Sequence, residues 1–140
     1  DHSFGYTPDT AYFTLDRMFK QQLYETATNL TVNHIINYNY HSEWKIPIAP
    51  EAYRRDLKLF GDQYSNFNAG KILLYLEGFA GLDYSIPDDN LTISPSFPDE
   101  WKWMELRLPI KNSWTRIHYD HDKVVVENSP LRVIKKQRID

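Results

Sequence analysis

The sequence predicts an α+β fold, in which N-terminal helices are followed by a C-terminal antiparallel β-sandwich. In the first half, apolar residues recur at steps of three and four positions, which is the period of a helix. After Gly81 the period becomes two, and short apolar segments are separated by Pro, Asp, Asn and Ser. This change of period predicts a helical segment at residues 1–82 and a sheet domain at residues 83–140.

The composition favours one folded domain, or part of a larger protein. The chain has 140 residues, of which 41% are hydrophobic and 15% aromatic, enough apolar surface to form a core. The net charge is -3 with both signs interspersed, so nucleic-acid binding is not expected. Cysteine is absent, which excludes disulfides and Cys-based zinc sites. No phosphate-binding, nucleophile-elbow or zinc-protease motif occurs, and we expect neither a cofactor nor a metal.

Three helices are expected in the first half. An amphipathic helix runs from Pro8 to Asn29, and a short one from Glu51 to Phe60 is bounded by Pro50 and Gly61. The stretch between them, rich in Asn, Tyr and His, is predicted to be an ordered loop. The third helix carries apolar residues on nearly all sides, which predicts burial. The residues sharing its main apolar face are Ala69, Ile72, Leu73, Leu76, Phe79 and Ala80.

Five short strands are expected in the second half, joined by tight turns. In the strand that begins at Met104, apolar residues alternate with Glu105 and Arg107, as expected of a half-buried strand. Hairpin turns are predicted at residues 88–90 and 120–122. The predicted strands are Leu91 to Ser94, Met104 to Ile110, Thr115 to Tyr119, Lys123 to Glu127 and Leu131 to Lys135.

Membrane insertion is not expected, because the longest apolar stretch, Ile72 to Leu76, is far shorter than the ~20 residues that a span needs. The sequence opens at Asp1 without a signal-peptide pattern, which is consistent with a processed or excised piece. Asn29 and Asn90 each begin an N-x-[ST] sequon, a weak indication of secretion.

Several short motifs lie on either side of the predicted boundary. They are Asn66-Phe67-Asn68-Ala69-Gly70, Leu74-Tyr75-Leu76-Glu77-Gly78-Phe79-Ala80-Gly81-Leu82, Leu91-Thr92-Ile93-Ser94-Pro95, Phe97-Pro98 and Trp101. Together they resemble the end of an (α/α) six-hairpin toroid glycosidase or phosphorylase, a superfamily that includes disaccharide phosphorylases of the maltose and trehalose type. In that superfamily the last barrel helix ends in a glycine-flanked turn, and a small C-terminal β-sandwich follows.

The resemblance implies a carbohydrate ligand and an incomplete enzyme. A toroid of ~12 helices needs ~190 residues before any sandwich is added, so this chain could supply only the last barrel helices. In the family the general acid lies upstream of that region. We therefore expect an isolated chain to be inactive and to need an upstream polypeptide, or to associate with itself through its exposed barrel face.

Two carboxylates are candidates for the general base that glycosidic cleavage needs. In toroid hydrolases the base often comes from late in the barrel, and Glu43 and Glu51 lie in the corresponding region. Trp44 beside Glu43 could stack on a sugar ring. The alternatives are that Glu43 is a solvated loop acid and that Glu51 complements a helix N-terminus.

Aromatic residues in the second half give a second hypothesis, a non-catalytic carbohydrate-binding or structural module. Trp101, Trp103 and Trp114 could form a platform on which a sugar stacks, although tryptophans in such a domain more often fill its edge. The run from His118 to Asp122 contains metal-ligand types, but the alternation of a strand favours a surface hairpin. Glu77, in an otherwise apolar helix, needs either a hydrogen-bond partner or access to solvent.

Overall fold

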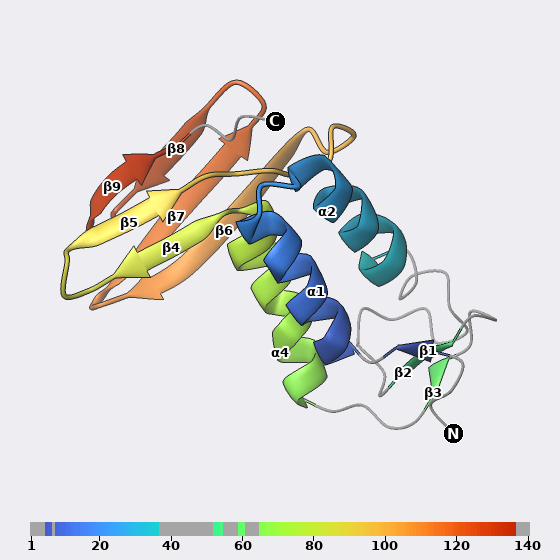
Figure 1. Ribbon diagram of the computed structural model, residues 1–140. Helices are drawn as coiled ribbons and strands as arrows, with labels where there is room; N and C mark the ends of the chain where they lie inside the picture. The colour runs from blue at the N-terminus through green and yellow to red at the C-terminus, as the bar shows by residue number, and fades with distance from the viewer. Residues whose placement is uncertain (1–4, 7, 37–51, 55–58, 61–64, 137–140) are drawn as a thin grey trace.

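A pair of packed helices and two stacked three-stranded sheets form the main body of the protein (Figure 1). The computed structural model describes residues 5–6, 8–36, 52–54, 59–60 and 65–136. Helices dominate the described part of the first half and strands dominate the second half, so the predicted α+β class is confirmed.

The first predicted helix is interrupted. Helix α1 spans Pro8–Lys20, helix α2 spans Tyr24–Leu30, and a π-helix, η1, continues over Thr31–Ile36. Between α1 and α2, Gln22 has a φ of 65°, the Gln22 amide donates to the Phe19 carbonyl and the Leu23 amide donates to the Met18 carbonyl. This pair of hydrogen bonds is the Schellman ending of a helix, which usually has glycine at the left-handed position. Because glutamine stands there, no sequence signal marked the break.

The prediction of a short helix from Glu51 to Phe60 is wrong. The described residues of that range form strand β2 (Ala52–Arg54) and strand β3 (Leu59–Phe60). Strand β1 (Gly5–Tyr6) pairs with β2, and β2 pairs with β3, in a small antiparallel sheet. Pairing with a segment far upstream overrides the weak local helix signal, which rested on flanking Pro and Gly rather than on a long apolar period.

The third predicted helix is present as helix α4 (Ser65–Leu73) and a following π-helix, η2 (Leu74–Phe79). Figure 1 shows α4 beside α1, and a Cβ placed on Gly70 would lie 3.2 Å from the Tyr12 Cβ. The glycine thus allows the two helices to approach closely. Leu74 and Phe79 are buried as predicted, whereas Ile72 is 53% exposed. No helix within the described ranges is both long and apolar enough to cross a bilayer.

All five strands predicted in the second half are confirmed, and one further strand, β4, lies between η2 and the first of them. One sheet has the order β4-β5-β9 and the other the order β6-β7-β8. Every pair in them is antiparallel except β5 with β9, which is parallel. The strands are β4 (Leu82–Ser85), β5 (Asn90–Ile93), β6 (Trp103–Ile110), β7 (Ser113–Asp120), β8 (Val124–Glu127) and β9 (Arg132–Lys135).

One apolar core joins the helices to the sheets. Tyr119 on β7 is fully buried, and its hydroxyl donates a hydrogen bond of 3.1 Å to the carbonyl of Ala80, just after η2. Phe79 is also fully buried and packs edge-to-face on Trp101. The predicted domain boundary between residues 82 and 83 stays a prediction. The most deeply buried core members are Ala27, Leu74, Phe79, Ala80, Leu91, Ile93, Ile117 and Tyr119.

Candidate functional site

The predicted site residues fall into two groups. Glu43, Trp44 and Glu51 lie outside the described residues, so their roles stay predictions. Trp101 and Trp103 are described, and they lie in different surroundings at the beginning of β6.

Trp101 is held in the protein by packing. Its ring centroid lies 5.4 Å from that of Phe79 at an interplanar angle of 70°, an edge-to-face contact. The Trp101 carbonyl accepts a hydrogen bond of 2.7 Å from His121 Nε2, and its amide donates to the Pro98 carbonyl. This placement favours the packing role over sugar stacking.

Trp103, in contrast, is 60% exposed. Its ring stacks on that of His118, with centroids 6.0 Å apart and an interplanar angle of 20°. The strand register explains the contact, because Glu105 lies opposite His118 and Trp103 lies diagonally across from it on the same face. The stack holds the indole while leaving it accessible to solvent.

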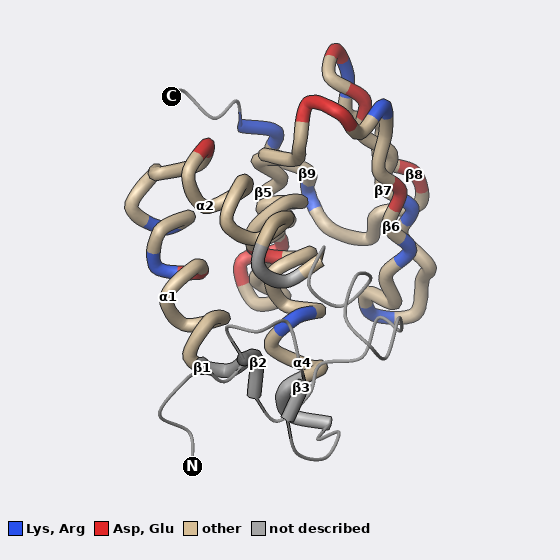
Figure 2. Tube along the Cα trace, turned by 90° about the vertical axis from the view of Figure 1, so that its right-hand side faces the viewer, with Lys and Arg blue, Asp and Glu red and all other residues tan. Residues whose placement is uncertain are grey.

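Charged side chains occupy the same sheet face beside Trp103. Glu105 accepts hydrogen bonds from Arg116 at 2.7 Å and from Arg107 at 3.2 Å. Arg116 also donates to Glu127 on β8 at 3.2 Å. Figure 2 shows charges of both signs mixed along β6, β7 and β8. The Arg116 guanidinium, followed by that of Arg107, holds the pKa of the Glu105 carboxyl below its usual range.

We expect the depressed pKa of Glu105 to be measurable by NMR titration of its side-chain carboxyl carbon. Arg116→Gln should move that pKa back toward its ordinary value, because it removes the 2.7 Å hydrogen bond. Arg132→Gln, on the other sheet, is the control and should leave it unchanged. The network stabilises the fold above the usual carboxyl pKa, and this contribution is lost as the pH falls through the lowered value. An unshifted Glu105 in the unmodified chain would contradict the observed geometry.

Among the described residues, His118 is not gathered with other metal-ligand side chains into a cluster. Its Nδ1 is buried without a hydrogen-bond partner and lies 3.9 Å from Glu105 Oε2. His121 is engaged with the Trp101 carbonyl, and within the part of the chain that is described no cluster of three or more His, Asp or Glu could hold a metal ion.

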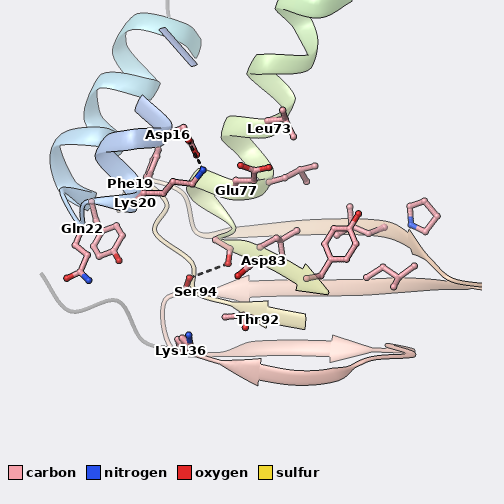
Figure 3. Close-up of a pocket in the computed structure, with 18 residues that line it drawn as sticks. Asp16, Phe19, Lys20, Gln22, Leu73, Glu77, Asp83, Thr92, Ser94 and Lys136 are labelled. Atoms are coloured by element: carbon pink, nitrogen blue, oxygen red, sulfur yellow. Dashed lines mark hydrogen bonds and ion pairs between the residues drawn. The ribbon is translucent and has the colours of Figure 1, made fainter. Parts of the chain in front are cut away.

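A cleft of about 1120 Å³ lies where the helices meet the sheets, and Figure 3 shows it from the side. Lys20 and Asp16 on α1 form an ion pair of 2.8 Å, and Glu77 on η2 faces them. The Tyr12 hydroxyl donates to Glu77 Oε2 at 3.4 Å, which supplies the partner that Glu77 was expected to need. Burial, followed by the nearby Glu77 carboxylate, raises the pKa of Tyr12.

The cleft offers hydrogen bonding to a polar ligand. Asp83 on β4 and Thr92 on β5 line its sheet side, and Lys136 adds a second cation (Figure 3). Among these residues, only Glu77 is unusual in the sequence, as a carboxylate in an otherwise apolar helix. The others come from elements distant in sequence, and no local motif indicates that they meet.

Comparison with known proteins supports the resemblance found in the sequence. Residues 85–135 match a family model described as "Glycosyl hydrolase family 65, C-terminal domain". A solved structure titled "Putative kojibiose phosphorylase from human microbiome" has a similar fold, with a TM-score of 0.56 and 17% sequence identity. The match covers 89% of this chain but only 15% of that one. No curated protein matches the chain in sequence. The family match and the similar fold thus confirm that the chain resembles the C-terminal part of a toroid enzyme like those of glycosyl hydrolase family 65.

Proposed function

We propose that this chain acts as the C-terminal segment of a carbohydrate-active enzyme and that catalysis requires an upstream polypeptide. The shared core is the observation that carries the proposal. Phe79 packs on Trp101, and the Tyr119 hydroxyl bonds the Ala80 carbonyl, so the sheet domain fixes the end of the last described helix. In this role the domain stabilises the end of a helical barrel.

The surface of the helical layer supports a larger assembly. Phe13 on α1 is 66% exposed, and Ile72 on α4 is 53% exposed. A contiguous apolar patch on a surface, unlike a single apolar side chain, marks a site that a partner covers. We infer that the upstream polypeptide covers them, with self-association of this chain as the other possible partner.

The first test is to isolate the native material under non-denaturing conditions and analyse it by light scattering with peptide mapping. The proposal predicts that the 140-residue chain co-purifies with a larger polypeptide or is itself part of one. A stable monomer that melts cooperatively and has no partner would contradict it.

The catalytic part of the proposal assigns Glu43 or Glu51 as general base, with Trp44 as a sugar-stacking residue. Glycosidase assays on the complete enzyme should show a loss of about 10²–10⁴-fold in Glu43→Gln or Glu51→Gln, as is usual when a general base is removed. If both variants keep full activity, the general base lies elsewhere.

A second candidate function, a non-catalytic carbohydrate-binding module, is favoured by the exposure of Trp103. A 60% exposed indole held against a second ring is the kind of surface on which sugars stack. This function does not need a complete barrel, and the two candidates are therefore separable by binding measurements on this chain alone.

A further inference from the structure

The outer face of the sheet β6-β7-β8 carries a second exposed tryptophan. Trp114 on β7 is 67% exposed, more than Trp103. Alternation along β7 places Trp114, Arg116 and His118 on this face, because Thr115 and Ile117 between them are fully buried. Both indoles thus point away from the core on one side of one sheet.

The strand register gives the separation of the two rings along the sheet. Trp114 pairs with Pro109 on β6, and Pro109 lies six residues beyond Trp103 on the same strand. At about 3.3 Å per residue, the two tryptophans are about 20 Å apart along the strand direction. That separation is too large for one small molecule to contact both rings.

Hydrogen-bonding groups fill the interval between the rings. The rows between them hold Glu105 and Arg107 on β6, with Arg116 and His118 on β7. The Arg116–Glu105 and Arg107–Glu105 hydrogen bonds hold these side chains in place while leaving the Arg107 side chain 70% exposed and the Arg116 side chain 44% exposed. A ligand lying along the face would meet an aromatic ring, a polar row and a second aromatic ring.

This order of groups fits a neutral oligosaccharide. The rings of a sugar chain present C–H faces to indoles and hydroxyls to carboxylates and guanidiniums. Opposite charges are paired on this face, so it has no positive field for phosphates. An amphipathic helix is also a poor fit, because a charged row separates the apolar groups.

We propose that Trp103 and Trp114 are two stacking positions of one oligosaccharide-binding surface on the outer face of β6-β7-β8. The ligand class rests on the proposed function, whereas the surface itself needs no upstream polypeptide. Trp103 is preorganised by its stack on His118, so little side-chain freedom is lost on binding.

The test is isothermal titration of the 140-residue chain with a panel of neutral oligosaccharides built from glucose, xylose, mannose or galactose, each in increasing length. Affinity should rise with length until one chain reaches both rings, because the second contact is then intramolecular. Trp103→Ala and Trp114→Ala should each weaken binding of the longest ligand about tenfold, equal to about 1.4 kcal/mol.

Phe13→Ala is the matched control, because Phe13 is 66% exposed but lies on α1, away from this sheet and outside the lining of the cleft. It should leave binding unchanged, and circular dichroism melts should show that all three variants fold. Binding that ignores both tryptophan substitutions, affinity that does not depend on length, or no binding across the panel would overturn the proposal. None of these results would affect the co-purification test of the incomplete enzyme.

Discussion

Replacing Phe79 by alanine is expected to lower the free energy of unfolding by about 3–5 kcal/mol, the usual cost of deleting a buried phenylalanine. The Phe79 side chain is fully buried. Its ring contacts Phe19 at 6.1 Å between centroids, Tyr75 at 5.9 Å and Trp101 at 5.4 Å. These partners come from α1, η2 and the segment before β6, so no single element can move to fill the cavity. The measurement is urea unfolding followed by circular dichroism.

Phe13→Ala is the control for this prediction. It removes the same side chain from α1 at a position that is 66% exposed, and its effect should stay within about 0.5 kcal/mol. Tryptophan fluorescence should report the same transition as circular dichroism, because Phe79 touches Trp101 in the shared core. A loss of less than about 1 kcal/mol for Phe79→Ala would show that the helices and sheets are not packed on each other as described.

The strands of the sheet domain were predictable because their signal is local. In β6, Met104 and Ile110 are buried while Arg107 is exposed. The apolar and charged residues that alternate in the sequence therefore face the core and the solvent, respectively. Strand β4 (Leu82–Ser85) was missed because only two residues separate it from η2 and both Asp83 and Tyr84 are exposed. A short strand without alternation has no signature of its own.

The helical segment was predicted less well, because the deciding interactions are not local. The break after α1 depends on Gln22, a residue without the usual preference for a left-handed φ. The strands found between Glu51 and Phe60 depend on pairing with Gly5 and Tyr6, more than 40 positions upstream.

The candidate sites show the same limit. The sequence drew attention to both Trp103 and Trp114, but the polar row between them exists only through the register of β6, β7 and β8. The cleft depends in turn on how α1 and η2 meet the sheets, which brings Lys20 and Glu77 toward Asp83 (Figure 3).

Gly78→Ala is the second substitution for which we expect a large effect, a loss of about 1–3 kcal/mol in the free energy of unfolding. A Cβ at this position would lie 2.7 Å from Phe19 Cε2 and 3.0 Å from Cδ2. Phe19 is 4% exposed and packs edge-to-face on Phe79, so its ring cannot swing away without disturbing the core. The better helix propensity of alanine, about 1 kcal/mol, offsets only part of this cost.

Gly70→Ala is the matched control, because the nearest atom to its new Cβ would be the Tyr12 Cβ at 3.2 Å, a milder contact between α1 and α4. It should cost less than Gly78→Ala in the same urea experiment. Phe19→Leu removes the ring that collides with the new methyl group, so in the Phe19→Leu background the cost of Gly78→Ala should shrink. A double-mutant cycle measures that coupling. Strictly additive effects would contradict this explanation. They would mean that the Phe19 ring is not what requires glycine at position 78, so the tight packing inferred between α1 and η2 would be wrong.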